Sequence, residues 1–171
     1  MADKLNALII DDDIDAAEWL SYVLRSRFPQ LEVTIRLTPN IAGPFDLYFV
    51  DNDFHGTCLA GELACAIRAV NPRALIVAVS ARLDIGTLKR LVNVGCDGAC
   101  DKSDPTDVSR MQSIVAAYIE RTDEERRQPN GQGFFGAIRS IRGLLKEWNQ
   151  RLETNPNGVA YAAQSRPAMI G

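Results

Sequence analysis

Four short apolar segments of the sequence each end in polar residues that could take part in phosphoryl chemistry. Asp11 and Asp12 follow ALII, Asp51 follows LYFV, Ser80 ends ALIVAVS, and Lys102 follows GACD. If the segments are neighbouring parallel strands, their carboxyl ends share one crevice, which is where open α/β sheets bind ligands. Three crowded carboxylates are unfavourable unless a divalent cation lies among them. The sequence therefore predicts a phosphoryl-acceptor site together with a metal ion.

Composition limits the classes of protein to consider. The 171 residues are 46% hydrophobic and 24% charged, which is typical of a globular protein with one core and an appendage. No stretch approaches the ~18 apolar residues of a membrane span, and the N-terminus lacks the layout of a signal peptide, so a cytoplasmic location is expected. A net charge of −3 offers no basic field for nucleic acid. We expect neither membrane insertion nor direct DNA binding.

The four cysteines have no CxxC spacing, and the single histidine, His55, does not complete a convincing zinc set with them. We expect these thiols to be buried for structural reasons. Cys58 and Cys65 are seven residues apart and are expected on one helix face, while Cys100 falls in an apolar run. A redox role stays open, although nothing in the spacing of the cysteines indicates one.

The chain alternates short apolar runs with amphipathic stretches, a pattern typical of βαβ units and a parallel sheet. Capping and stop signals support the helix limits: Asp13 precedes the first helix, Pro72 and Gly95 follow later ones, and Pro105 opens the last. The predicted strands are 5–10, 32–37, 46–51, 74–80 and 97–101, and the predicted helices are 14–27, 57–70, 84–94 and 105 to about 127.

The connection between the second and third predicted strands is unusually short. Only residues 38–45 intervene, and they include two prolines and a glycine. A crossover with its helix takes at least ~10–12 residues, so a full helix does not fit. We expect this face of the sheet to be thinly covered, leaving a candidate docking surface or dimer contact.

Residues 5 to about 122 resemble a response-regulator receiver domain, the module that histidine kinases phosphorylate. LIIDDD resembles the acidic motif of the first strand, FDLYFVD the third strand with its phosphoacceptor, VSA the end of the fourth strand, and VGCDGACDK the segment around the lysine. The resemblance implies a flavodoxin-like, doubly wound five-stranded parallel sheet of order 2-1-3-4-5. The family's second helix is missing or reduced here, and the receiver domain would span 1–127.

The resemblance also implies a role for each site residue. Asp51 would be the nucleophile that forms an acyl phosphate, Lys102 would pair with the phosphoryl oxygens, and Ser80 would donate a hydrogen bond once that group arrives. Magnesium or manganese would offset the repulsion between the two anions through octahedral oxygen coordination. Its protein ligands would be Asp11 (through a water), Asp12, Asp51 and the backbone carbonyl of Asp53.

Several residues near the site depart from the family pattern. Ala99 replaces the aromatic residue that reports phosphorylation, so output must use another route. Ser103 replaces a cis-proline, so the bond before it either relaxes to trans or is held under strain, and the lysine before it would be less rigidly aimed. The resemblance implies that Asp53 and Arg82 occupy the two positions that flank the path of attacking water, where they could form an ion pair. His55 is expected to be an exposed loop side chain.

The C-terminal part, 128–171, does not resemble the family. QPNGQG is a break by composition, and 134–153 predicts an amphipathic helix whose apolar residues step by four and three. This stripe is too short for a confident coiled coil. Docking on the receiver, homodimerisation and partner binding therefore stay open, and the last residues are expected to form a tail.

Together these features predict a stand-alone response regulator of a two-component phosphorelay. A histidine kinase or phosphotransfer protein would phosphorylate it, and it would signal to a downstream protein partner. Beyond its own phosphorylation and autodephosphorylation we expect no enzyme activity. A pseudo-receiver adaptor that is never phosphorylated is the alternative. A haloacid-dehalogenase-like phosphatase is more remote: Asp51-Asn52-Asp53 resembles its motif, but a complete βα unit precedes it and His55 replaces the usual threonine.

Overall fold

A parallel β-sheet forms the centre of the computed structural model, which describes residues 4–127. Its five strands lie in the order β2-β1-β3-β6-β7, as the sequence predicted. The strand limits differ from the predicted ones by no more than one residue at either end. They are β1 (Leu5–Ile10), β2 (Leu31–Arg36), β3 (Leu47–Asp51), β6 (Leu75–Ser80) and β7 (Gly98–Asp101).

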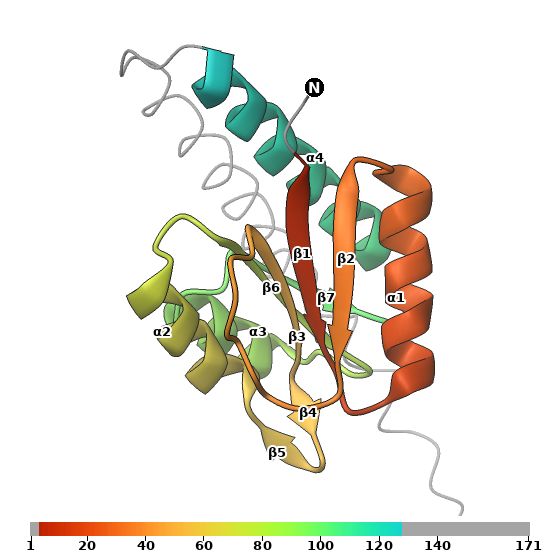
Figure 1. The fold of residues 1–171 in the computed structure, drawn as a ribbon. Coiled ribbons are helices and arrows are strands. Elements are labelled where there is room, and N and C mark those ends of the chain that lie inside the picture. The colour runs from red at the N-terminus through yellow and green to blue at the C-terminus, as the bar shows by residue number, and fades with distance from the viewer. Residues whose placement is uncertain (1–3, 128–171) are drawn as a thin grey trace, which may run out of the picture.

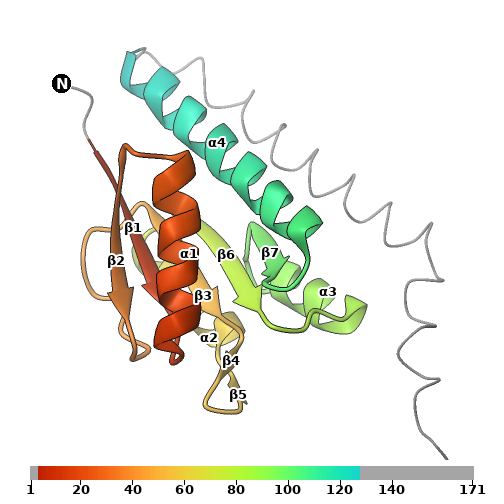
Figure 2. The ribbon, with the colours of Figure 1, turned by 90° about the vertical axis from the view of Figure 1, so that its right-hand side faces the viewer.

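Helices cover both faces of the sheet, so the fold is flavodoxin-like and doubly wound (Figures 1 and 2). Helices α1 (Ile14–Arg27) and α4 (Pro105–Arg127) cover one face, and α2 (Ala60–Val70) and α3 (Ile85–Asn93) cover the other. Each face has its own buried apolar cluster, because successive strand residues point to opposite sides. Within residues 4–127 no helix has the length and apolarity needed to cross a membrane.

Short polar side chains at the carboxyl edge of the sheet start two of the helices. The Oδ1 atom of Asp13 accepts hydrogen bonds from the backbone N–H groups of Asp15 and Ala16 at 2.9 and 3.3 Å. Asp84 does the same for Thr87 at 2.6 Å. These bonds satisfy backbone donors that have no partner in the first turn. The predicted cap at Asp13 is confirmed, and α1 begins directly after the acidic run.

No helix forms between β2 and β3, and the reason lies in the outer strand. In β2, buried Leu31 and Val33 alternate with exposed Glu32 and Thr34. The face of β2 opposite α1 is therefore polar and needs no helix to bury it. Phe45, at the end of the short connection, is 9% exposed and packs in the apolar cluster on the α2–α3 face of the sheet. The missing second helix is confirmed, but the surface left on β2 is polar and gives no support to an apolar docking site there.

A small hairpin replaces the first turn of the predicted 57–70 helix. Strands β4 (Asp53–Phe54) and β5 (Thr57–Cys58) pair antiparallel, and Figure 1 shows them beyond the carboxyl edge of the sheet. His55 and Gly56 join them with positive φ values of 48° and 78°, as a tight two-residue hairpin turn requires. The hairpin delays the start of α2 to Ala60.

The hairpin also corrects the prediction for the thiols. Cys58 lies in β5 and does not share a helix face with Cys65, and both side chains are exposed. Cys96 and Cys100 are buried, as expected. Burial raises the pKa of each of these two thiols to about 12. They are therefore neutral packing groups at physiological pH.

Candidate functional site

Strand register brings the predicted site residues to one edge of the sheet. Ile10 of β1 is paired with Val50 of β3, so Asp11 and Asp51 each follow a paired residue at the same level. Ser80 of β6 is paired with Asp101 of β7, which precedes Lys102. The carboxyl ends of parallel strands therefore converge, as the sequence predicted.

An acidic cluster occupies the middle of this edge. One carboxylate oxygen from each of Asp11, Asp12 and Asp51 lies within 4.8 Å of the others. The Lys102 ammonium bridges two of them, with Nζ 2.6 Å from Asp11 Oδ2 and 2.8 Å from Asp51 Oδ1. Asp11 and Asp51 are only 2% and 4% exposed. One ammonium against three carboxylates leaves an excess of negative charge in a poorly hydrated place.

The pKa values of Asp51 and Lys102 are shifted by burial and by the neighbouring charges. Burial raises the pKa of the Asp51 carboxyl, Asp11 raises it further, and the hydrogen bond and charge of Lys102 offset only part of the rise. Burial lowers the pKa of Lys102, but its hydrogen bonds and attraction to Asp11 and Asp51 outweigh burial and raise it. The lysine is therefore held as an ammonium. A further cation would relieve the remaining repulsion.

The donor set of the cluster fits a hard divalent cation. Carboxylate oxygens are the side-chain ligands that Mg²⁺, Mn²⁺ and Ca²⁺ prefer, and three of them are within reach of one ion. Asp53, whose carbonyl the resemblance adds to this set, lies two residues beyond Asp51 in β4. The Asp53 N–H donates to Asp51 Oδ2 at 2.8 Å. The three carboxylates could thus hold a metal ion.

The hydroxyl of Ser80 is not directed at Asp51 in this structure. Its Oγ donates to the carbonyl of Arg82 at 2.9 Å and accepts from the Arg82 N–H at 3.3 Å. Arg82 itself is exposed, as is Asp53, and within residues 4–127 the two side chains form no ion pair. The ion pair that the sequence allowed between Asp53 and Arg82 is thus not formed in this structure.

Hydrogen bonds from Asp101 hold the loop that carries Lys102, although the proline of the family pattern is absent. The bond between Lys102 and Ser103 is trans, since the described residues include no cis peptide. Asp101 Oδ1 accepts from the N–H and the hydroxyl of Ser103 at 2.8 and 2.5 Å. Its Oδ2 accepts from the Leu83 N–H at 3.3 Å. Asp101 thereby secures the turn after β7, a role that sequence reasoning missed.

Ala99 is packed where the family pattern has a mobile aromatic residue. It lies in β7 at 3% exposure, in the apolar cluster that also contains Leu88 and Leu91 of α3. Alanine has no rotamer to switch. The structure therefore has no counterpart of the aromatic switch at this position.

The sequence did not predict the contact between His55 and Asp12. The His55 side chain is 73% exposed, yet Nδ1 lies 2.7 Å from Asp12 Oδ2. Its backbone N–H also donates to the same oxygen at 2.9 Å. The available signal was the adjacent His-Gly pair, which suits a tight turn that would bring the imidazole back over the strand ends.

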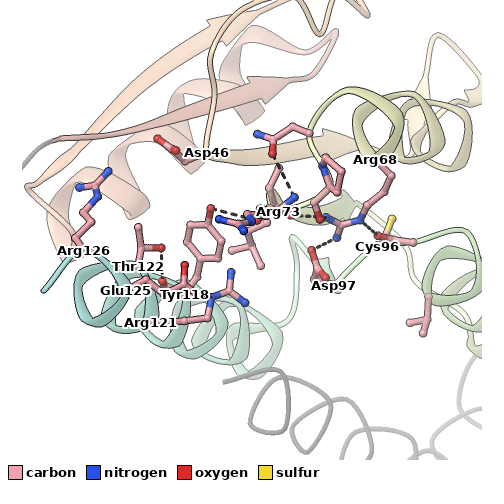
Figure 3. Close-up of a pocket in the computed structure, with 16 residues that line it drawn as sticks. Asp46, Arg68, Arg73, Cys96, Asp97, Tyr118, Arg121, Thr122, Glu125 and Arg126 are labelled. Atoms are coloured by element: carbon pink, nitrogen blue, oxygen red, sulfur yellow. Dashed lines mark hydrogen bonds and ion pairs between the residues drawn. The ribbon is translucent and has the colours of Figure 1, made fainter. Parts of the chain in front are cut away.

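A second charged region lies at the amino edge of the sheet. There a cleft of about 820 Å³ is bordered by the ends of α2 and α4 (Figure 3). Arg68 donates to the carbonyls of Gly95, Pro72 and Ala74 at 3.1, 3.2 and 2.5 Å, and it pairs with Asp97. Asp97 in turn accepts from the Ile76 N–H at 2.8 Å. These bonds join α2 to the starts of β6 and β7.

Comparison with known proteins defines the fold. No family model matches the chain, and no curated protein matches it. Solved structures do match. A two-component response regulator from Clostridium difficile is 19% identical, with 70% of this chain and 98% of that chain covered and a TM-score of 0.59. The chain has the receiver-domain fold.

Two further structures give the same result. A signal receiver domain of a DNA-binding response regulator from Colwellia psychrerythraea is 20% identical over 68% of this chain and 99% of that chain, with a TM-score of 0.58. A CheY-like receiver domain protein from Methanospirillum hungatei is 20% identical over 71% and 98%, with a TM-score of 0.57. We refer to residues 4–127 as the receiver-like domain.

Proposed function

We propose that the receiver-like domain belongs to a two-component response regulator and accepts a phosphoryl group on Asp51. The donor would be a histidine kinase or a phosphotransfer protein. The observation that carries the proposal is the position of the Asp51 carboxylate, which is buried beside Asp11 and Asp12 with Lys102 Nζ 2.8 Å away. The receiver-domain fold supports the same function.

The chemistry follows from the groups around Asp51. A carboxylate oxygen of Asp51 attacks phosphorus, the new O–P bond forms as the P–N bond to the donor histidine breaks, and the released imidazole nitrogen takes up a proton. Lys102 stays beside the nucleophile and balances charge on the phosphoryl oxygens. A magnesium or manganese ion bound by Asp11, Asp12, Asp51 and the Asp53 carbonyl would supply the remaining neutralisation.

Ser80 and Ala99 determine how the event is reported. To donate to a phosphoryl oxygen, the Ser80 hydroxyl must leave the Arg82 carbonyl, so the contact that joins Ser80 to the loop after β6 is broken. Ala99 cannot pass that change to the surface by a rotamer switch. A signal to a downstream protein would therefore have to start from the loss of the Ser80–Arg82 contact and not from an aromatic switch.

Phosphorylation by a small-molecule donor tests the proposal. Acetyl phosphate with Mg²⁺ should add one phosphoryl group to the wild-type chain, as seen by intact-mass spectrometry, and none to Asp51→Asn. Asp53→Asn is the matched control, because it makes the same change two residues away and keeps the backbone carbonyl. Equal labelling of the wild type and Asp51→Asn would refute the assignment. A wild type that never gains the group would favour a pseudo-receiver adaptor.

The remaining parts of the proposal concern the setting of the domain. A cytoplasmic location, a stand-alone regulator without direct DNA or membrane contact, and no activity beyond autodephosphorylation all stay predictions. The amphipathic helix predicted for 134–153, with its possible homodimer, lies outside the described residues. Size measurement of the full chain and a 1–127 truncation, with and without phosphorylation, would test the dimer.

A further inference from the structure

The β4–β5 hairpin contacts the acidic cluster through Asp12. Both the backbone N–H of His55 and its Nδ1 atom approach one oxygen of Asp12, Oδ2, at 2.9 and 2.7 Å. The two residues are 43 apart in sequence. The contact therefore ties a surface hairpin to a residue that the proposed metal site needs.

The hairpin is held in place well enough to direct the imidazole. Phe54 is 4% exposed and packs in the apolar cluster beneath α2 and α3. The rings of Phe54 and His55 meet edge to face, with their centroids 5.1 Å apart. The positive φ of His55 turns the chain back toward Asp12. One residue anchors the hairpin in the core, and the next reaches the cluster.

The hydrogen bonds of the cluster single out one free oxygen. Asp11 accepts from the Asp13 N–H through Oδ1 and from Lys102 through Oδ2. Asp51 accepts from Lys102 through Oδ1 and from the Asp53 N–H through Oδ2. Asp12 differs, because both contacts from His55 fall on Oδ2, and within residues 4–127 no donor is seen at Oδ1.

We propose that His55 is a positioning residue for the metal site: it holds Asp12 by Oδ2 and leaves Oδ1 to bind the cation. The inference rests on the proposed function, since it assigns a role at the same site. The backbone N–H of His55 forms the hydrogen bond to Asp12, and the imidazole adds an ion-pair contact at the same oxygen. Partners of metal-binding carboxylates fix their orientation, and removing one typically costs about 10–100-fold in metal affinity.

Two substitutions separate the imidazole from the turn. His55→Gly removes the side chain and keeps a residue suited to positive φ. His55→Asn also tolerates positive φ and places an amide nitrogen close to the position of Nδ1. Mn²⁺ titration, followed by the electron paramagnetic resonance of the free ion, should show affinity about 10–100-fold weaker for His55→Gly, with most of it restored in His55→Asn.

The controls make the result decisive. Thermal melting in EDTA should be similar for the three proteins, because the loss concerns the metal-bound state. Unchanged or tighter Mn²⁺ binding by His55→Gly, or no recovery in His55→Asn, would overturn the inference. If the inference fails in this way but the wild type binds Mn²⁺ and Asp12→Asn does not, the proposed metal site still stands. If the wild type itself binds no Mn²⁺, both the inference and the metal part of the proposed function fail.

Discussion

The two edges of the sheet both concentrate charge, but they use it differently. At the carboxyl edge, three carboxylates share the ammonium of Lys102. At the amino edge, Arg68 directs its donors to three backbone carbonyls and to Asp97, which also accepts a backbone N–H. The first region has an excess of negative charge. In the second region, the charged groups form hydrogen bonds that hold the strands and α2 together.

This difference separates a candidate site from a structural support. Buried polar groups are normally satisfied by partners within the protein, and the Arg68 region follows that rule. The carboxylates of the acidic cluster also accept hydrogen bonds, but their charge is not balanced, because the ammonium of Lys102 faces three carboxylates. The unbalanced negative charge of the acidic cluster therefore favours binding of an external cation. The cleft in Figure 3, although large, borders side chains already engaged in holding strands together.

The largest expected effect comes from breaking the support at the amino edge. Arg68→Ala should lower the free energy of unfolding by about 2–4 kcal/mol, because Asp97 and three carbonyls lose a charged donor. Arg82→Ala is the control, since that side chain is exposed and should change stability by less than about 0.5 kcal/mol. Urea denaturation measures both. Equal losses for the two variants would remove the contrast between the edges.

A change in β7 tests the packing between the edges. Ala99→Tyr introduces the ring that the receiver pattern would have, next to Leu88 and Leu91. Because Ala99 is 3% exposed, we expect this overpacking to cost about 1–3 kcal/mol in urea denaturation. Ala99→Ser adds only one atom and should cost less. If Ala99→Tyr left the free energy of unfolding unchanged, the structure would have room for an aromatic ring at this position.

Metal should stabilise one edge only. At 10 to 100 times its dissociation constant, Mn²⁺ should raise the free energy of unfolding by about 1–3 kcal/mol, and EDTA should reverse the gain. Asp12→Asn should abolish most of this response. Asp97→Asn, the same change at the amino edge, should keep it while lowering the baseline stability. A response that survives in Asp12→Asn would place the metal elsewhere.

The smallest effect concerns the thiols, whose exposure distinguishes core from surface. Burial raises the pKa of Cys96 and Cys100 to about 12, so these two stay protonated and shielded even at pH 9. Cys58 and Cys65 are exposed. Iodoacetamide should therefore alkylate two thiols quickly in the native protein and all four after unfolding, as counted by mass spectrometry. Rapid native labelling of Cys100 would contradict the packing of β7.

Much of the fold followed from the sequence because its signals are local and repeated. The apolar runs of the five strands, the cap at Asp13, the glycine after α3 and the short 38–45 segment each gave the correct element or its absence. The hairpin β4–β5 did not follow, since two-residue strands carry no periodicity. Only the His55-Gly56 turn marked it.

The convergence of the acidic cluster was also predictable, because parallel strands fix which ends meet. What the sequence could not supply were contacts that depend on side-chain orientation. The hydroxyl of Ser80 donates to the carbonyl of Arg82, and His55 contacts Asp12. Arg68 pairs with Asp97, which is 29 residues away in the sequence. In the sequence each of these residues has the appearance of an ordinary loop or surface side chain.

The most direct test of the central claim is the amide spectrum of the protein with Mg²⁺ and beryllofluoride, a phosphoryl mimic. Amide shifts should change at the carboxyl edge, around Asp51, Ser80 and Lys102, and stay constant around Arg68 and Asp97. Asp51→Asn should show no such change. An unaltered wild-type spectrum, or the same change in Asp51→Asn, would contradict the assignment of Asp51 as the phosphoryl acceptor.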